Sequence, residues 1–275
     1  MKDKIIQSFT IKGLFGLYDV HIPFENDVMI LIGENGMGKT QIMNLLYYVL
    51  SNNLNKISIK NIDSIKVKFK DNIEHTLDKS TVTTRFTFMD NELIDRNIFI
   101  RNVEKSLEKY KILYLPSNRR IDKSVINFSR INKENKSNHS IRKFTDVCNK
   151  YLLDKTLIYD ENKVNIYVKI NLNNQRLHLS DLSFGEKQII SIFSKIYLSS
   201  IDSEFIVLID EPELSQSIFW QRNFLPDIYN SGKVRFLFAV THSPFIFENE
   251  LDKYAVSLNE YMKPLTTLQI EQATC

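Results

Sequence analysis

GENGMGKT, at residues 33–40, is the stretch that decides the fold of this sequence. Three of the chain's seven glycines fall within it. The apolar run VMILI at residues 28–32 has the length and branching of a buried strand, and residues 41–50 carry apolar side chains at helical spacing. Glycines between a strand and a helix let backbone N–H groups wrap phosphate oxygens at the N-terminus of the helix. The stretch therefore predicts a phosphate-binding loop in an α/β fold.

The side chains of this loop predict how a nucleotide is held. Lys39 is expected to reach the β and γ phosphates, and the hydroxyl group of Thr40 to bind Mg²⁺. The other positions expected to contact the nucleotide are Gly33, Glu34, Asn35, Gly36, Met37 and Gly38. The alternative is a glycine turn with an incidental lysine, but the flanking strand and helix favour the phosphate loop.

A second element, FIVLIDEPE at residues 205–213, is a hydrophobic strand that ends in adjacent carboxylates. A strand buried on both faces delivers Asp210 to its carboxyl end, where the carboxylate can support a magnesium ion. Glu211 follows one residue later, where it can polarise a water molecule. Two adjacent acids are also common on protein surfaces, so this interpretation depends on the phosphate loop earlier in the chain.

A third element, LSFGEKQ at residues 182–188, predicts a short turn at the start of a helix. Ser183 and the amides near Gly185 are expected to be free to bind an anion. By itself the pattern is an ordinary helix cap that contains a glycine. Its position, some 22 residues before the acidic strand, makes a role at the same nucleotide site the more specific interpretation.

The rest of the chain alternates between regular patterns. Alternating apolar and polar residues over 56–101 predict half-exposed antiparallel strands, and a short helix over 107–110 is expected to lead into a buried strand, ILYLP, at 112–116. Two or three strands are expected over 156–179. A helix from about Ser183, a strand over 205–209, a helix over 215–229 and a strand over 234–240 follow, which favours a parallel sheet with crossover helices.

Composition narrows the class of protein. The chain has 275 residues, of which 43% are hydrophobic and 25% are charged, and its formal net charge is only +3. Cys148 and Cys275 lie far apart, so neither a disulfide framework nor a zinc site is supported. The N-terminus carries no signal-peptide pattern, and no apolar run approaches the length of a membrane-spanning helix. We therefore expect a cytoplasmic protein with no membrane partner.

Charge is strongly segregated in one segment, residues 117–143. It contains eight basic residues and only two acidic ones, so its formal charge is +6. A solvated face, a contact with DNA and a contact with an acidic protein are all compatible with such a run. Only Phe128 and Phe144 are interleaved with the charges, so any DNA binding is expected to be independent of sequence and dominated by phosphate contacts.

The order GENGMGKT, LSFGEKQ, LIDEPE and VTHSP, the last at residues 240–244, resembles the ATP-binding-cassette superfamily. Within it, ENGMGKT, LSFGEKQ and DEPELS followed by WQ are similar to the soluble SMC-like branch, which includes RecF, the OLD-family ATPases and the ATPase subunits of anti-phage systems such as Septu. The resemblance covers residues 5 to about 260. Transporter cassettes usually carry a glycine-glycine-glutamine signature instead.

The resemblance implies ATP and Mg²⁺ as ligands and a site shared between two subunits. Lys39 and Thr40 would bind phosphate and magnesium, Asp210 would support the metal, and Glu211 would be the general base. The resemblance assigns Ser183, Gly185 and Glu186 to ATP bound by the opposite subunit, and His242 to sensing the γ phosphate in its own subunit. A buried structural histidine is the alternative for His242.

Some positions depart from the family pattern. Phe184 replaces the first glycine of the signature and adds bulk near the expected dimer seam. Ser217 stands where relatives often have histidine. The glutamine that links the metal to the lobe interface has no clear counterpart; Asn118 is the best candidate, and a surface turn is an equal alternative. No cluster of acids, or of His and Cys, follows His242, so we expect a compact ATPase whose effector is a separate protein.

The expected fold is α/β, a P-loop NTPase of the ABC ATPase type with a mixed sheet, flanking helices and an antiparallel β part. We expect one ATPase domain over residues 1–275, with a core at 1–116 and 154–275 and a small, basic helical insertion at 117–153. The first functional hypothesis is the ATPase subunit of a prokaryotic defence complex, which dimerises on ATP and regulates a nuclease or toxin. A DNA-repair ATPase of the RecF kind and a transporter cassette are the alternatives.

Overall fold

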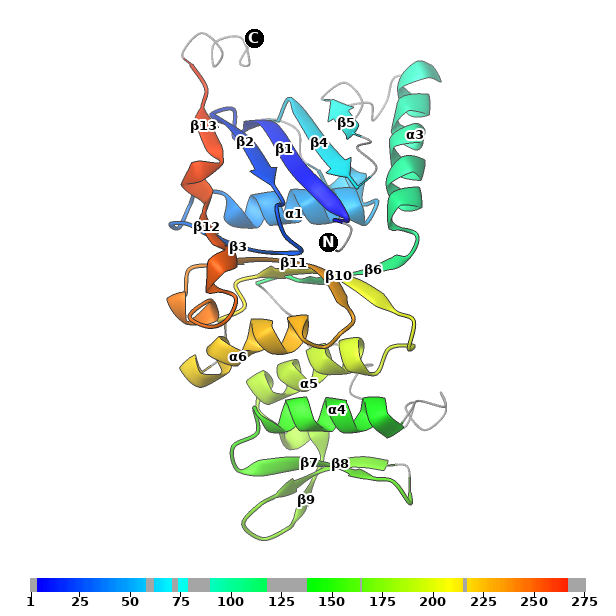
Figure 1. Ribbon diagram of the computed structural model, residues 1–275, viewed down its shortest axis with the longest axis vertical. Helices are drawn as coiled ribbons and strands as arrows, with labels where there is room; N and C mark the ends of the chain where they lie inside the picture. Colours follow the sequence, from blue (N-terminus) through cyan, green and yellow to red (C-terminus); the bar gives the residue numbers. More distant parts are fainter. Residues whose placement is uncertain are drawn as a thin grey trace.

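The computed structural model describes residues 4–57, 62–70, 74–78, 90–117, 138–163, 165–214 and 217–266, with only the backbone for 90–96. The elements form stacked layers along the long axis of the molecule, from an antiparallel sheet through α1 and a parallel sheet to helices and a terminal three-stranded sheet (Figure 1). The predicted α/β class, with a parallel sheet and an antiparallel β part, is confirmed.

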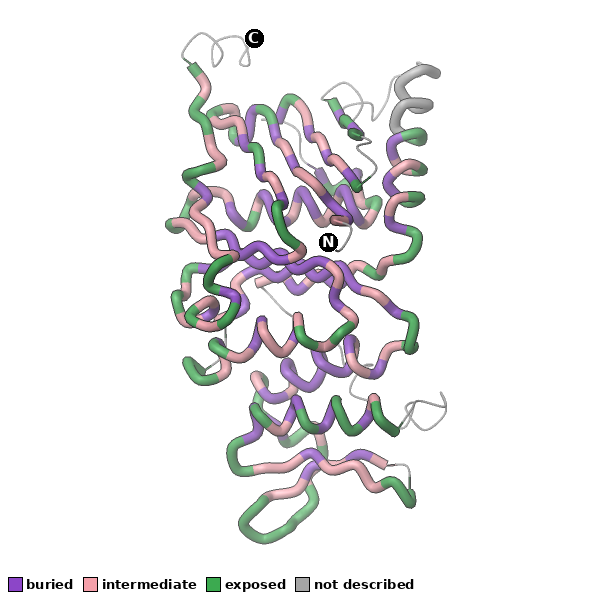
Figure 2. Tube along the Cα trace, in the orientation of Figure 1, coloured by how far each residue is buried: buried purple, intermediate pink, exposed green. Residues whose placement is uncertain are grey.

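The central parallel sheet carries the strands that the motifs predicted. Its order is β12-β3-β11-β10-β6, and each neighbouring pair is parallel. The bounds are Val28–Ile32 for β3, Tyr110–Leu115 for β6, Glu204–Asp210 for β10, Val234–Thr241 for β11 and Ala255–Ser257 for β12. Figure 2 shows this sheet as the most continuously buried part of the chain, as expected for parallel strands covered on both faces.

Two hydrophobic cores lie on opposite faces of the parallel sheet because successive side chains of a strand point in opposite directions. Ile206 and Leu208 of β10 belong to the first core, whereas Val207 and Ile209 belong to the second. The first core is closed by α1 and the antiparallel sheet. The second is closed by α5 (Phe184–Tyr197), α6 (Ile218–Tyr229) and α4 (Asn138–Asn149). The glycine loop therefore leads into a helix, α1, that is packed between two sheets.

The antiparallel sheet has the order β13-β2-β1-β4-β5, so the last described strand of the chain pairs with one of the first. The bounds are Ile6–Leu14 for β1, Tyr18–Pro23 for β2, Ser64–Phe69 for β4, Glu74–Asp78 for β5 and Met262–Pro264 for β13. Buried residues alternate along β4 and β5, which is typical of strands with one face on a core. This part confirms the antiparallel strands predicted within 56–101.

The remaining β structure lies at the far end of the molecule, beyond α4 (Figure 1). The strands predicted over 156–179 are β7 (Lys155–Asp160), β8 (Asn165–Ile170) and β9 (Arg176–Leu177), in an antiparallel sheet. The end of α4 is tied to α6 by the Tyr151 hydroxyl group, which donates to Asp227 at 2.8 Å. Short 3-10 helices connect other elements: η1 Leu54–Lys56, η3 Leu179–Asp181, η4 Pro244–Ile246, η5 Asp252–Tyr254 and η6 Leu258–Glu260.

One sequence prediction is wrong. Strands were expected as far as residue 101 and a short helix over 107–110, but α3 runs over Asp90–Leu107 and ends where that helix was expected to begin. The reason is the spacing of Phe99, Val103 and Leu107, which recur every fourth residue and are all buried. This spacing places them on one helix face, which packs on the first core.

Candidate functional site

The glycine loop has a backbone that requires glycine at two positions. Gly36 and Gly38 adopt φ angles of 84° and 90°, in the left-handed region. A Cβ atom at Gly38 would lie 2.7 Å from Cε2 of Phe15. Gly38 is the N-cap of α1 (Lys39–Leu50), which has no side-chain cap and no acidic residue in its first turn. The N-terminus of α1 is therefore open to an anion, in the geometry that binds phosphate.

The ammonium group of Lys39 is held inside the glycine loop by hydrogen bonds to the loop backbone. Its Nζ donates to the carbonyl oxygens of Gly33 at 2.7 Å and Glu34 at 2.8 Å, and only 5% of the residue is exposed. Burial lowers the pKa of Lys39, and nearby carboxylates, Glu211 first among them, oppose that shift. A triphosphate would replace the two carbonyl groups as partner of this cation.

The carboxyl end of β10 meets the start of α1, as the motifs predicted. The Thr40 hydroxyl group donates to Oδ1 of Asp210 at 3.1 Å, which joins residues 170 positions apart. Asp210 is fully buried. Glu211 has a φ angle of 48°, in a region that residues with a Cβ rarely adopt. Such strain concentrates at functional sites, and Glu211 directly follows the strand that ends at Asp210.

His242 completes this cluster from the neighbouring strand, β11. Its Nδ1 lies 3.4 Å from Nζ of Lys39, and its Nε2 lies 3.8 Å from Oε1 of Glu211. The side chain is 30% exposed, so the alternative of a buried structural histidine is not what the structure shows. The backbone N–H of His242 donates to Glu213 at 2.9 Å, and the Thr241 hydroxyl group donates to the same carboxylate at 2.8 Å.

Glu213 is a positioning residue that the sequence analysis missed. Its carboxylate holds the turn that carries His242, although it lies three residues beyond Asp210, in the turn that follows β10. The only signal was the third acid of the DEPE stretch, which the two preceding acids overshadowed. Gln221, in α6, was also missed as a site residue: its side chain accepts a hydrogen bond from Ser243 at 2.6 Å, next to His242.

The donors at this junction fit a magnesium ion. Thr40 and Asp210 offer a hydroxyl and a carboxylate oxygen, and Mg²⁺ is usually held by one or two such groups together with substrate phosphates and waters. Among the described residues no group of three or more His, Cys, Asp or Glu side chains is placed to hold a metal alone. The site therefore matches a magnesium ion that arrives with a nucleotide.

The predicted signature turn is closed by its own side chains. Ser183 is the N-cap of α5: its Oγ accepts from the N–H of Glu186 at 3.3 Å, and the Glu186 carboxylate accepts from the N–H of Ser183 at 2.7 Å. Lys155 donates to the other oxygen of Glu186 at 2.9 Å. Within the described residues, no hydrogen bond of Ser183 or Glu186 reaches the glycine loop. Phe184, between them, is 50% exposed.

A pocket of about 430 Å³ lies directly beside the glycine loop and was not predicted. Its walls come from the loop and from both ends of the chain, and the residues are Phe15, Tyr18, Asn35, Gly36, Met37, Asn259, Met262 and Pro264. Phe15 adopts a φ angle of 60° in the turn between β1 and β2. None of these side chains is charged. No local motif marks the pocket, because its walls are brought together by strand pairings distant in sequence, β12 with β3 and β13 with β2.

Three further sequence predictions concern Asn118, the basic segment over 117–143, and Ser217. Asn118 and most of the basic segment, residues 118–137, lie outside the described residues. Within the described part of that segment, Arg142 forms an ion pair with Glu161 at 2.6 Å. Ser217 is the N-cap of α6 and accepts a hydrogen bond from the N–H of Trp220 at 3.3 Å.

A family model described as ABC transporter matches residues 23–213. The chain belongs to this family. No curated protein matches the chain significantly. Because the matched span includes the glycine loop, the signature turn and the acidic strand, the site is that of an ABC-type, ATP-binding ATPase. Among the described residues, no helix of this ABC-type chain has the length and apolar character to cross a membrane.

Solved structures of similar fold include SMC head domains. The head bound to the C-winged helix domain of ScpA has 12% identity and a TM-score of 0.52, covering 98% of this chain and 99% of that chain. The Thermotoga maritima SMC head domain has 15% identity and a TM-score of 0.52, covering 96% and 100%. The Pyrococcus furiosus Smc head has 10% identity and a TM-score of 0.53, covering 98% of each. At such identities the likeness shows the fold alone.

Proposed function

We propose that this ABC-type ATPase is a subunit of a prokaryotic anti-phage defence system. In this proposal ATP joins two copies head to head, as a dimer or a higher oligomer, and hydrolysis releases them. The change of state switches a separately encoded effector, a nuclease or a toxin. The observation that carries the ATPase part is the junction of Lys39, Thr40 and Asp210 with the strained Glu211 and His242. The defence part is supported by the similarity of the motifs to those ATPases.

The chain's own residues suggest the division of labour during hydrolysis. Lys39 would exchange its two carbonyl partners for phosphate oxygens, and the open N-terminus of α1 would hold the same phosphates. Glu211 would accept a proton from the attacking water, and His242 would hydrogen-bond the γ phosphate. Mg²⁺, when bound at Thr40 and Asp210, would supply positive charge to the phosphate oxygens.

The second half of the site is proposed to come from the partner subunit. Ser183 is exposed at the surface, and because its Oγ accepts from Glu186, its hydroxyl proton remains able to donate to a phosphate. Phe184 is exposed beside it, at the predicted seam. A signature turn that makes no contact with its own glycine loop is what a shared site requires.

Mixing two inactive variants tests the shared site. Lys39→Ala and Ser183→Arg are each expected to abolish ATP hydrolysis in homodimers. A mixture should regain activity, because the heterodimer contains one site with an intact glycine loop and an intact facing signature. If the mixture stays inactive while exchange of subunits is demonstrated, the site is not composite or the two sites act only together.

The second candidate is a DNA-repair ATPase of the RecF kind, which the basic segment favours. The Arg142–Glu161 ion pair shows that at least one of those charges is neutralised within the chain. Changing Arg130, Lys133, Lys136, Arg142 and Lys143 to Glu should weaken DNA binding for all sequences and flatten its salt dependence, without altering basal ATP turnover. If the wild-type protein with ATP shows no DNA affinity at low salt, this candidate loses its main support.

Identification of the proteins that co-purify with the native chain separates the remaining candidates. The SMC head bound to a ScpA domain gives a precedent for a head of this fold that holds a separate protein. A co-purifying nuclease or toxin supports the defence role. A co-purifying permease would support a transporter cassette instead.

A further inference from the structure

The uncharged pocket beside the glycine loop extends the proposed ATPase function, on which this inference rests. The charged groups that bind phosphate, among them Lys39, line no part of it. Its walls are aromatic, thioether and proline surfaces with the amides of Asn35 and Asn259. Its volume of about 430 Å³ falls within the range of about 300–1,000 Å³ typical of small-molecule sites. The chemistry matches a planar, uncharged nucleobase.

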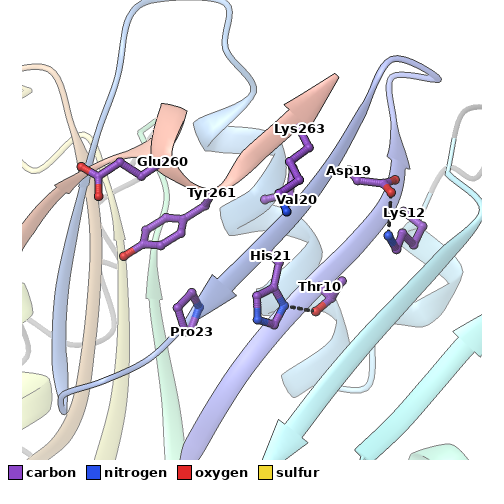
Figure 3. Close-up of a pocket in the computed structure, with 9 residues that line it drawn as sticks. All are labelled: Thr10, Lys12, Asp19, Val20, His21, Pro23, Glu260, Tyr261 and Lys263. Carbon is purple, nitrogen blue, oxygen red and sulfur yellow. Dashed lines mark hydrogen bonds and ion pairs between the residues drawn. The ribbon is translucent and has the colours of Figure 1, made fainter. Parts of the chain in front are cut away.

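A second pocket, of about 330 Å³, makes the contrast clear. It lies on the outer face of the antiparallel sheet, and four of its charged and polar side chains form two pairs (Figure 3). Lys12 bonds to Asp19 at 2.6 Å, and Thr10 bonds to His21 at 2.7 Å. These four side chains satisfy one another, whereas the side-chain amide of Asn259 in the uncharged pocket makes no hydrogen bond within the described residues.

The C-terminal wall of the uncharged pocket is anchored to the glycine loop. Leu258 is fully buried, and its Cβ would lie 3.5 Å from a Cβ built on Gly33. Asn259 follows in the middle of η6, with its backbone N–H bonded to the Ser257 hydroxyl group at 3.3 Å. The position of Asn259 is therefore set by the loop that holds the phosphates.

The same wall is continued by β13 and tied to the aromatic side of the pocket. Pro264 pairs with Tyr18, and the N–H of Leu265 donates to the carbonyl of Leu17 at 2.8 Å. Met262, between these anchors and η6, also lines the pocket. Residues 257–264 lie outside the span 23–213 that matches the family model, so this wall is a feature of the chain beyond the matched domain.

We propose that Asn259 reads the edge of the nucleobase and selects adenine over guanine. Within the described residues its side-chain amide makes no hydrogen bond, so one donor and one acceptor are available together. Adenine presents an amino donor beside a ring-nitrogen acceptor, which an asparagine amide matches with two hydrogen bonds. Guanine presents two acceptors on the corresponding edge, so the amide oxygen would face another oxygen. Phe15 and Met262 supply apolar surfaces for the ring.

Competition binding on the full chain tests this assignment. ATP and GTP, each with Mg²⁺, compete against an ATP analogue that carries a fluorophore on its ribose. The wild-type protein should prefer ATP by about 10-fold or more, the effect expected of one well-placed pair of hydrogen bonds. In Asn259→Ala and Asn259→Asp the preference should fall to within about 3-fold, mainly through weaker binding of ATP.

Asn55→Ala is the matched control, because Asn55 is also an exposed central residue of a 3-10 helix behind a buried leucine. It should keep the wild-type preference. Photolabelling of the wild-type protein with 8-azido-ATP gives a second measurement that does not depend on folding of a variant. The labelled peptides should contain residues 259–264 or 15–18.

Three results would overturn the assignment: no preference in the wild-type protein, the wild-type preference retained by both Asn259 variants, or labelling of other peptides. If the Asn259 variants keep the preference while Lys39→Ala binds neither nucleotide, the base assignment fails and the ATPase function stands. If the wild-type protein binds neither nucleotide, the proposed function fails as well.

Discussion

Two helix N-termini of this molecule are both expected to meet phosphate, but they are built in opposite ways. The N-terminus of α1 follows Gly38, has no side-chain cap and has no acid in its first turn. The N-terminus of α5 follows Ser183 and is closed by a reciprocal cap with Glu186, whose carboxylate is also bonded to Lys155. The first leaves its N–H groups and its positive dipole end for a ligand, whereas the second satisfies part of them internally.

The difference indicates two different roles for phosphate at the two helices. At α1 the chain alone provides an anion site, so one subunit should bind nucleotide. At α5 the negative charge of Glu186 opposes an approaching phosphate, so in the proposed dimer binding there would depend on the Ser183 hydroxyl group and on a phosphate already held by the other subunit. In the proposed dimerisation, ATP would therefore bind first at the open N-terminus of α1 and only then meet the capped N-terminus of α5.

The largest effect is expected from Glu211→Gln, which separates binding at α1 from chemistry. The substitution keeps the size of the side chain but removes the proton acceptor, so hydrolysis should slow by about 10²- to 10⁴-fold while ATP still binds. With hydrolysis blocked, light scattering should detect a dimer only when ATP is present. Normal turnover in this variant would mean that another residue activates the water.

The next largest effect is expected from Gly38→Ala at the N-terminus of α1, which we compare with Gly185→Ala at the N-terminus of α5. Gly38→Ala forces a side chain into a left-handed conformation and against Phe15, so nucleotide binding should weaken by about 10-fold or more. Gly185→Ala changes a position in the first turn of α5 that has no positive φ angle, so a side chain there requires no left-handed backbone and should weaken nucleotide binding less. Equilibrium nucleotide binding and urea unfolding of both variants measure the contrast. If both variants lost nucleotide binding equally, the N-termini of α1 and α5 would not differ in the way argued above.

The parts of the site that could be predicted from sequence are those in which local chemistry decides the structure. The meeting of Thr40 with Asp210 follows from a glycine loop and an acidic strand in one parallel sheet, since the carboxyl ends of parallel strands share an edge. Asn259 could not be predicted in this way, because it reaches the loop through two pairings that span most of the chain, that of β12 with β3 and that of β13 with β2.

The wrong prediction at α3 has a physical cause of the same kind. Alternating apolar residues continue from the true strands at 64–78 toward residue 90, and a period of two was extended into a segment whose buried residues recur every four. The helical spacing is visible only in the buried residues near the end of the helix, which are Phe99, Val103 and Leu107. The cap at α5 was predicted as a helix start, but its closure by Lys155 depends on the packing of β7 beside it.

A smaller effect is expected from Glu186→Gln, which weakens the closed cap. Burial raises the pKa of Glu186, but its hydrogen bonds to Lys155 and Ser183 outweigh this and leave the pKa below the ordinary range. A lowered pKa in the folded state stabilises the protein above the pKa of the unfolded carboxyl group and loses that effect as pH falls through the folded value. The variant should therefore be less stable by about 1–2 kcal/mol at pH 7.

Urea unfolding at a series of pH values measures this difference. It should be constant near neutral pH and shrink below about pH 4.3, where the wild-type carboxyl group begins to be protonated in the unfolded state. Glu161→Gln is the control, because Glu161 is an exposed carboxylate in an ion pair with Arg142 and contributes little to stability. A stability difference that does not change with pH would show that the cap does not depend on the charge of Glu186.

The smallest effect is expected from Ser217→Ala, which removes the cap of α6. Ser217 accepts one hydrogen bond of 3.3 Å from Trp220 and has no acidic partner in the first turn, so it lacks the reciprocal bond that Ser183 receives. A single long cap should contribute about 0.5–1 kcal/mol, less than the Ser183→Ala substitution removes from the closed cap of α5. Urea unfolding followed by the fluorescence of Trp220, the only tryptophan of the chain, ranks the two variants directly. Because Trp220 lies within the first turn of α6, a cap that contributes to local order should also change the emission of the folded state. If Ser217→Ala lowers the free energy of unfolding as much as Ser183→Ala does, the reciprocal bond and the charge of Glu186 add nothing to the cap of α5. The difference between the N-termini of α1 and α5 would then depend on the glycine loop alone.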